Sequence, residues 1–390
     1  MSTEWPLWAG ATPTPEDVRP APACPACGRP IDPAASFCES CGAPLVPTAA
    51  ARTPAPAPAH SANGDAPSTQ TRRLGERVSQ LADCPICGGS VGADGYCQTC
   101  GAKAPSARDH FTAAPAAWVG GVCDRGVRHS RNEDAMALWA EGDRAVLVVC
   151  DGVSTSIDSD VAALAGAEKA RDVLVAMNGD GVGGDESEES ALAAALVTAT
   201  AEANLAVIAN TAPDSTNAAS ATFAAAVVIG DRVHYANLGD SRVYLLCGTE
   251  RLLLSEDDSM AQAFIAEGMP RAEAEALPRA HAITKWLGRD AVDTVPRTGV
   301  QQVSTPGWLV VCSDGLWNYA STPEELSAQV EAAAADSDDP VEVAGRLVVW
   351  ANSRGGQDNV TVALARVPGR SPVTLKATSS DQEKESATHG

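Results

Sequence analysis

Three aspartates in this chain each stand at one end of an apolar run that is typical of a buried strand. Asp151 and Asp314 follow such runs, at 148–150 and 310–312, and each precedes a glycine. Asp358 stands just before a third run. Strands that end in carboxylates bring these groups together at the rim of a sheet, and oxygen ligands suit a hard cation such as Mg²⁺ or Mn²⁺. The pattern therefore predicts a metal site built on the three aspartates.

The region around these aspartates mixes the periodicities of strands and helices. The pattern predicts strands at 118–123, 144–150, 222–229, 232–238, 242–247, 308–312 and 360–366. It predicts helices at 159–177, 190–210, 257–268, 323–335 and 340–353. Gly230-Asp231 is a tight hairpin signal between two of the strands. Hairpins that alternate with long helices favour an α+β fold, with two antiparallel sheets and helices outside them.

Eight of the 12 cysteines form four C-x-x-C pairs, which make two similar modules. The pairs are Cys24 and Cys27 with Cys38 and Cys41, and Cys84 and Cys87 with Cys97 and Cys100. Four thiolates satisfy tetrahedral Zn²⁺, and such short modules need the metal in order to fold. A redox pair or an iron–sulfur cluster fits two matched sets less well. We expect two structural zinc ribbons that dock a partner; a passive spacer is the alternative.

Composition divides the 390 residues into ordered and polar segments. We expect the following order: a disordered N-terminus at 1–23, ribbon 1 at 24–42, a Pro/Ala-rich linker at 43–83, ribbon 2 at 84–101, a short linker at 102–115, a large domain at 116–368 and a disordered tail at 369–390. Pro/Ala-rich segments without an apolar period are typical of extended linkers.

Charge and apolar runs narrow the classes of partner. The net charge is −22, and residues 111–390 hold 20 basic and 40 acidic side chains, which leaves them at −20. Such a domain repels a phosphate backbone, so we expect no nucleic-acid partner. No run of 18 apolar residues and no signal peptide is evident, and the paired cysteines suit a reducing compartment. We therefore expect a cytoplasmic protein without a membrane partner.

The large domain resembles the metal-dependent protein phosphatases of the PPM family, type 2C. The resemblance starts at DRGVRHSRNEDA (124–135) and ends at GGQDNVTVALARV (355–367). Between them, in order, stand DG (151–152), ANLGDSRVYLL (236–246), LLLSEDDS (252–259), ITKWLG (283–288) and CSDGLW (312–317). Each segment is weak evidence by itself, but the ordered set is specific. It implies a four-layer αββα sandwich and hydrolysis of phosphoserine and phosphothreonine in proteins, opposing kinases.

The resemblance also implies a binuclear Mn²⁺ or Mg²⁺ centre. Asp151 would bridge both cations, and the backbone carbonyl of Gly152 would bind one of them. Asp314 and Asp358 would complete the other site. Two bridged cations acidify a shared water, which attacks phosphorus in line, so no protein nucleophile is required.

The segment before the first helix would contribute the remaining site groups. Glu133 or Asp134 would hold metal-bound waters or touch the first cation. The family often has an arginine near this segment that binds the substrate phosphate, and here the corresponding position falls on His129. Arg128 and Arg131 flank it, and any of the three suits the role.

Departures from the family pattern leave other functions open. The loop after Gly152 lacks two glycines of the common pattern, so a catalytically weak phosphoprotein-binding module is one alternative. A zinc-ribbon interaction protein that binds nucleic acid is another, which the charge disfavours. A third metal site near Asp214 and Asn217 matches poorly. The segment 255–300 would gate substrate choice, and a Ser/Thr kinase or adaptor would dock on the ribbons.

Overall fold

The computed structural model describes residues 84, 87–92, 96–101, 104, 106–153, 156, 158–177 and 186–369. Ribbon 1, the Pro/Ala-rich linker, the N-terminus and the polar tail that the sequence predicts lie outside these residues. All described residues belong to one compact unit, Gln80–Gly390.

Two antiparallel sheets form the centre of this unit. The six-stranded sheet has the order β1-β2-β13-β12-β8-β9, and the five-stranded sheet has the order β11-β7-β6-β4-β3. The strands of the first sheet are β1 (His110–Ala116), β2 (Val119–Asp124), β8 (Arg242–Cys247), β9 (Glu250–Leu253), β12 (Gly307–Cys312) and β13 (Val360–Val367). Those of the second are β3 (Ala135–Glu141), β4 (Arg144–Cys150), β6 (Phe223–Ile229), β7 (Arg232–Leu238) and β11 (Arg297–Gln302). Two short strands, β5 (Ser220–Ala221) and β10 (Leu287–Gly288), form a third pair.

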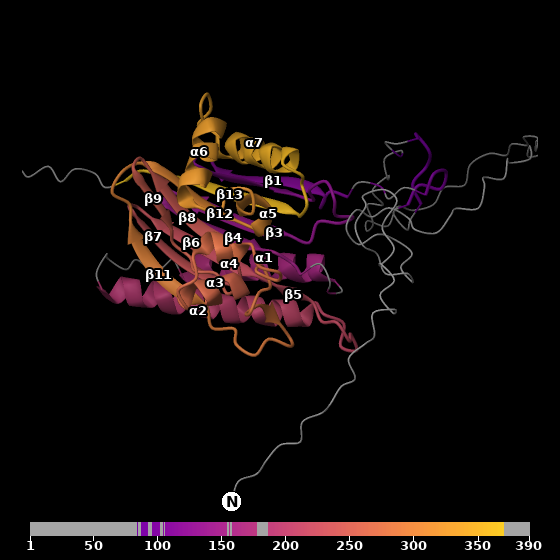
Figure 1. The fold of residues 1–390 in the computed structure, drawn as a ribbon, viewed down its shortest axis with the longest axis horizontal. Coiled ribbons are helices and arrows are strands. Elements are labelled where there is room, and N and C mark those ends of the chain that lie inside the picture. Colours follow the sequence, from indigo (N-terminus) through magenta and orange to yellow (C-terminus); the bar gives the residue numbers. More distant parts are fainter. Residues whose placement is uncertain are drawn as a thin grey trace, which may run out of the picture. The chain divides into compact units, whose positions relative to one another are not determined.

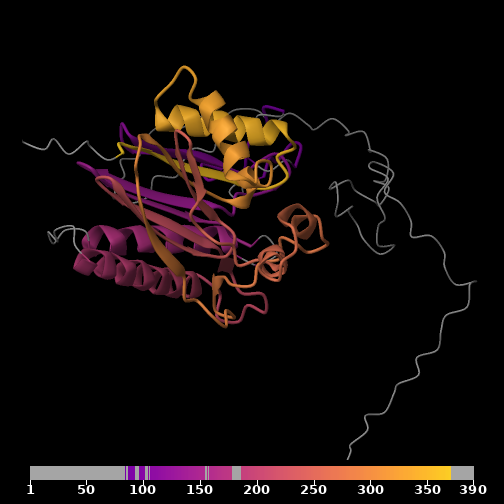
Figure 2. The same cartoon turned by 60° about the vertical axis from the view of Figure 1, so that its left-hand side comes forward.

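Helices cover the outer face of each sheet (Figures 1 and 2). Helices α1 (Ser159–Met177) and α2 (Glu186–Ala209) pack on the five-stranded sheet. Helices α5 (Asp314–Trp317), α6 (Pro323–Ala333) and α7 (Pro340–Ser353) pack on the six-stranded sheet. The result is the four-layer αββα sandwich that the resemblance implied.

Strand β4 shows why the central strands read as continuous apolar runs. Successive side chains of a strand point to opposite faces. Val146 and Val148 pack under α1 and α2, whereas Leu147 and Val149 pack between the two sheets. Both faces are buried, so the apolar run ends only where the strand reaches the rim, at Asp151.

The domain begins earlier than the sequence indicated. Strand β1 starts at His110, inside the segment predicted as a linker at 102–115, and pairs with β2. The side chain of Arg108 donates to the carbonyl of Asp134 (2.8 Å), and Asn132 Nδ2 donates to the carbonyl of Arg108 (2.9 Å). Residues from about 106 are therefore part of the sandwich.

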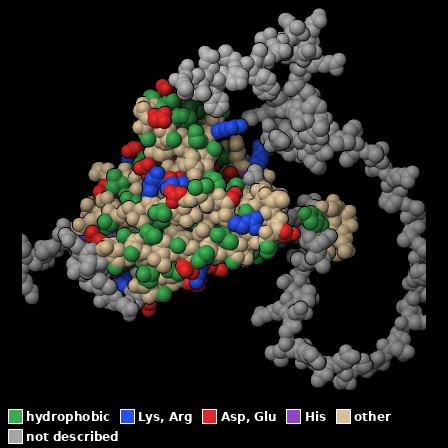
Figure 3. Space-filling model, turned by 90° about the horizontal axis from the view of Figure 1, so that it is seen from below, with side chains coloured by type: hydrophobic (Ala, Val, Ile, Leu, Met, Phe, Trp, Pro, Cys, Tyr) green, Lys and Arg blue, Asp and Glu red, His purple; other side chains and the backbone are tan. Residues whose placement is uncertain are grey.

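Helix α2 is long and apolar enough to span a membrane, whereas the sequence analysis found no such segment. By length and composition, Glu189–Ala209 is apolar enough to do so. Polar residues interrupt its apolar run, but the many alanines keep its mean hydropathy high. Its buried side chains, Leu196 and Val207 among them, belong to the core shared with α1 and the sheet. Seen from below, hydrophobic side chains are spread among charged ones (Figure 3). Within the described residues, α2 therefore packs one face on the core and leaves the other face exposed.

A small segment stands apart from the main core. Helices α3 (Met260–Ala266) and α4 (Arg271–Glu275) lie within the predicted gating segment 255–300, where the sequence predicted one helix at 257–268. Their own buried cluster consists of only three alanines, Ala261, Ala274 and Ala280, with partly buried neighbours such as Phe264. We call residues 260–282 the α3–α4 segment.

Candidate metal centre

The three predicted aspartates come together at one end of the sandwich. Asp151 follows β4, Asp314 starts α5 just after β12, and Asp358 stands two residues before β13. Each of these carboxylates is close enough to disfavour the charged form of another: the charges of Asp314 and Asp358 raise the pKa of Asp151, and that of Asp358 raises the pKa of Asp314. The convergence that the sequence pattern predicted is thus present.

The cluster also includes Asp134 and Asp240. Burial is the largest cause of the raised pKa of four of these aspartates: it raises the pKa of Asp151 and Asp314 well above the usual value, that of Asp134 to about 6 and that of Asp240 to about 7. Buried carboxylates that repel one another stay ionised only beside a compensating cation. The donor set therefore fits divalent cations with oxygen ligands.

Two buried oxygens in this cluster lack a donor. Asp134 Oδ2 accepts from Ser313 Oγ (2.6 Å) and Thr361 Oγ1 (2.7 Å), and Asp314 Oδ2 accepts from Asn318 Nδ2 (2.9 Å). The Oδ1 atoms of Asp134 and Asp314 have no such partner among the described residues. An unsatisfied buried acceptor costs about 1–3 kcal/mol, which a bound cation would offset.

Close backbone approaches hold the cluster in place. A Cβ at Gly152 would lie 2.6 Å from the carbonyl oxygen of Glu133, and a Cβ at Gly315 would lie 1.9 Å from that of Asn359. The backbone N–H of Asp151 donates to Thr222 Oγ1 (3.0 Å). Glycine is therefore required beside two of the aspartates because any side chain would push these loops apart.

Asn359 fastens the Asn132–Glu133–Asp134 segment to the start of β13. Its Oδ1 accepts from the backbone N–H of Glu133 (2.7 Å). Its Nδ2 donates to the carbonyls of Arg125 (2.7 Å) and Arg131 (3.1 Å). Asn359 thus orients loops rather than facing the cluster.

The three candidate phosphate-binding residues differ in their surroundings. Arg131 Nη2 lies 2.6 Å from Glu133 Oε1 and donates to the carbonyl of Ser156 (3.0 Å). The Arg131 guanidinium is therefore already bound to partners within the protein. His129 lies between two carboxylates, with Nδ1 3.7 Å from Glu133 and Nε2 3.3 Å from Asp358. The nearby carboxylate of Glu133 raises the pKa of His129. Arg128 is exposed, and its backbone N–H donates to Gly356.

Asp240 is a member of the cluster that sequence reasoning did not single out. It lies in the turn between β7 and β8, and Trp317 Nε1 donates to its carbonyl (2.9 Å). The available signal was the ANLGDSRVYLL segment, which places an aspartate two residues after the end of a strand. A turn aspartate and a site aspartate look alike in a sequence, because only the meeting of distant strands distinguishes them.

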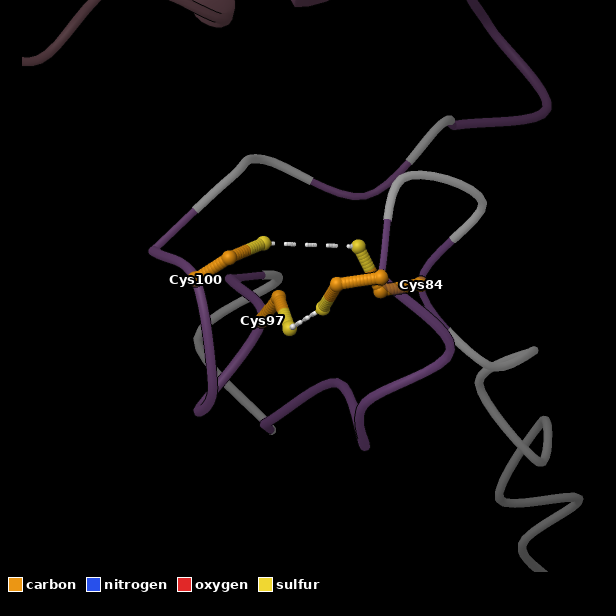
Figure 4. Close-up of side chains that lie close together, drawn as sticks. Cys84, Cys97 and Cys100 are labelled. Carbon is orange, nitrogen blue, oxygen red and sulfur yellow. Dashed lines mark hydrogen bonds between the residues drawn. The ribbon is translucent and has the colours of Figure 1, made fainter.

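The cysteines of ribbon 2 converge on one point (Figure 4). The Sγ atoms of Cys84 and Cys100 are 3.7 Å apart, and those of Cys87 and Cys97 are 3.5 Å apart. All four Sγ atoms lie within 4.8 Å of one another, a spacing that suits one tetrahedral Zn²⁺. Among the described residues no carboxylate set is as compact. The four cysteines of ribbon 1 lie outside the described residues.

Comparison with known proteins assigns the fold and the family. The sandwich is that of the PPM phosphatases: the serine/threonine phosphatase of S. agalactiae superposes with a TM-score of 0.53 at 24% identity, over 66% of this chain and 100% of that one. The Mycobacterium tuberculosis phosphatase PstP/Ppp superposes with a TM-score of 0.50 at 26% identity, over 66% and 99%. The protein phosphatase 2C family model matches residues 125–349, and the chain belongs to that family. The double zinc ribbon model matches residues 24–101.

Curated relatives are phosphatases that align over part of their length. Serine/threonine protein phosphatase PstP of Mycobacterium tuberculosis is 30% identical over 247 residues, which are 63% of this chain and 44% of the relative. Protein phosphatase PhpP of Streptococcus pneumoniae is 34% identical over 140 residues, 35% of this chain and 54% of the relative. The chain spans about half the length of the curated relatives it matches.

Proposed function

We propose that this chain is a protein serine/threonine phosphatase that hydrolyses phosphoserine and phosphothreonine with two Mn²⁺ or Mg²⁺ ions. The buried aspartate cluster carries this proposal, because its members repel one another and two of their oxygens lack a donor. Family membership and the names of the relatives support the same activity.

Family membership implies the ligand roles. Asp151 would be the ligand common to both cations, the carbonyl of Gly152 would bind one of them, and Asp314 and Asp358 would hold the other. When bound, the two cations supply an acidified water and offset the negative charge of the phosphoryl group. Asp134 is fixed by Ser313 and Thr361 and presents its remaining oxygen to the cluster.

The groups next to the cluster would orient the substrate. Glu133 is held by Arg131 and by Ser159 Oγ (2.6 Å), so it keeps a fixed position for a water molecule. His129 is the candidate that faces the phosphate, because its neighbouring carboxylates favour the imidazolium form, which donates from both ring nitrogens. Arg131 is better described as the residue that positions Glu133.

The ribbons would bind two structural Zn²⁺ ions and dock a phosphorylated substrate, a Ser/Thr kinase or an adaptor. Four thiolates leave no open coordination position, which favours a structural role. The geometry of ribbon 2 supports one zinc site directly. We place the protein in the cytoplasm because paired, reduced cysteines suit that compartment.

Hydrolysis of p-nitrophenyl phosphate and of a phosphothreonine peptide, with Mn²⁺ and then with EDTA, tests the proposal. Asp151→Asn should abolish turnover. Asp143→Asn is the matched control, since Asp143 is exposed in the turn at the other end of β4. Full activity in EDTA or in Asp151→Asn would refute the mechanism. A wild-type chain that binds phosphopeptides without hydrolysing them would be the phosphoprotein-binding module instead.

A further inference from the structure

A cleft of about 700 Å³ opens beside the aspartate cluster. Asp358 lines it, so the cleft is continuous with the candidate metal centre. Its walls come from three segments that are distant in the chain: the loop before β13, the stretch from α5 into α6, and the α3–α4 segment. A substrate whose phosphate reached the cluster would therefore extend its neighbouring residues into this space.

Negative charge collects in the cleft. Its lining includes the carboxylates of Glu275, Glu325 and Asp358, and it includes no lysine or arginine. The phosphate and the bound cations would compensate one another at the Asp358 side. Glu275 and Glu325 belong to α4 and α6, away from the aspartate cluster in the chain, and their charge would face whatever follows the phosphorylated residue.

The two glutamates differ in how far they are already neutralised. Glu275 accepts from Arg271 Nη1 (2.9 Å) and from Ser321 Oγ (3.2 Å). Glu325 is exposed in the first turn of α6, where it accepts from the backbone N–H of Thr322 (3.2 Å). It takes part in no ion pair with the residues that the structure describes. Glu325 is therefore the carboxylate available to an incoming cation.

Aromatic side chains complete the wall. The rings of His281 and Trp317 are 5.8 Å apart, and Tyr319 is held by a hydrogen bond from the backbone N–H of Gln357 (3.2 Å). Trp317 is buried and already stacked by Arg242, so His281 and Tyr319 offer the accessible ring surface. Such a surface beside carboxylates suits lysine and arginine, because their aliphatic stems pack on rings while the charged end reaches an acidic group.

We propose that this cleft binds a lysine or arginine of the phosphoprotein substrate close to the phosphorylated residue, with Glu325 as the principal specificity-determining residue. The proposal rests on the proposed function and adds a substrate class to it. The occupant must present an anion to the aspartate cluster and a cation to Glu325. A phosphopeptide with a neighbouring basic residue does both.

Three phosphothreonine peptides test the proposal. They differ only in the residues on both sides of the phosphothreonine, which are arginine in the first, alanine in the second and glutamate in the third. The wild-type chain should give the highest kcat/KM with the arginine peptide. Glu325→Gln should lower the arginine-to-alanine ratio about two- to fivefold, the range for one partly exposed ion pair, mainly through KM. Glutamine preserves the capping box at the start of α6, so the fold is retained.

Glu324→Gln is the matched control, because Glu324 is an exposed neighbour on the same helix and does not line the cleft. The preference should also fall as salt is raised, since exposed charges are screened. Equal kcat/KM for all three peptides, or the same ratio in Glu325→Gln and Glu324→Gln, would overturn the proposal.

A chain that hydrolyses neither the peptides nor p-nitrophenyl phosphate would instead overturn the proposed function. The cleft is then tested by fluorescence anisotropy with the same labelled peptides. The arginine peptide should bind the wild-type chain more tightly than the alanine peptide, and Glu325→Gln should reduce that difference. Equal affinities would overturn the proposal independently of catalysis.

Discussion

Replacement of Arg242 by alanine should destabilise the domain by about 3–5 kcal/mol. Arg242 is 1% exposed, and its guanidinium donates to Asp257 from Nε (2.9 Å) and from Nη2 (2.6 Å). Its Nη1 donates to the carbonyl of Ser321 (3.0 Å), and its Cζ atom lies 3.5 Å from the centre of the Trp317 ring. One side chain therefore joins β8, the segment before α3, and the α5–α6 connection.

The magnitude follows from what the substitution leaves behind. Asp257 is 6% exposed, so without Arg242 a carboxylate would remain buried without its principal cation. Breaking a buried pair in this way costs about 3–5 kcal/mol, a large part of the roughly 5–15 kcal/mol that stabilises a typical domain. At about 2–4 °C per kcal/mol for a domain of this size, Tm should fall by about 6–20 °C.

Thermal and urea unfolding, followed by circular dichroism at fixed Mn²⁺, measure this effect. Arg251→Ala is the control: its ion pair with Glu331 (3.0 Å) joins side chains that are 35% and 61% exposed, so its loss should cost at most about 1 kcal/mol. Arg242→Met combined with Asp257→Leu should recover much of the stability, because no buried charge is left alone. If Arg242→Ala were no more destabilising than Arg251→Ala, this account of the buried pair would be wrong.

Four further outcomes are expected. Asp314→Asn and Asp358→Asn should each lower kcat by about 100-fold or more at saturating Mn²⁺ while leaving the circular dichroism spectrum unchanged; near-normal turnover would refute the ligand assignment. Gly315→Ala should cost about 1–3 kcal/mol in urea unfolding, because its Cβ would meet the Asn359 carbonyl, whereas Gly345→Ala in α7, whose nearest neighbour would be 4.0 Å away, should be neutral or stabilising. Deletion of residues 1–104 should retain activity on p-nitrophenyl phosphate and reduce it on the protein substrate, and loss of both activities would place the ribbons in the catalytic fold; deletion through residue 110 should destabilise the domain, since it removes Arg108. Metal analysis of the full chain should find about two Zn²⁺, one for each set of four cysteines, and fewer than one would exclude the ribbon assignment.

The central strands and the aspartates at their ends could be predicted from the sequence for a physical reason. A strand buried on both faces must be apolar throughout, so β4 and β12 stand out, and the first polar residue after each marks the rim. Helices α1 and α7 were predicted with the bounds that the structure shows, since their apolar period and the flanking polar residues agree.

The edge strands and the cleft could not be predicted from the sequence, for the opposite reason. Strand β1 alternates between exposed and half-buried positions, and its sequence HFTAAPA contains a proline that reads as linker. Strand β11 is the edge of its sheet and is polar at most positions. Asp240 and the pair Glu275 and Glu325 acquire a role only where segments far apart in the chain meet, which no local pattern records.

The three-alanine cluster of the α3–α4 segment affects how this wall of the cleft opens. Local unfolding is governed by the apolar area that a segment buries, and alanines bury little, so this segment should exchange its amide hydrogens much faster than the strands beneath it. Its links to the body are few: Ser321 Oγ donates to Glu275 (3.2 Å), Arg242 Nη2 lies 3.9 Å from Glu275, and the His281 ring lies 5.8 Å from that of Trp317. We therefore expect this wall to open more readily than the sheets. If the proposed function holds, a few substitutions in this wall would change which substrates are accepted while the aspartate cluster stays as it is.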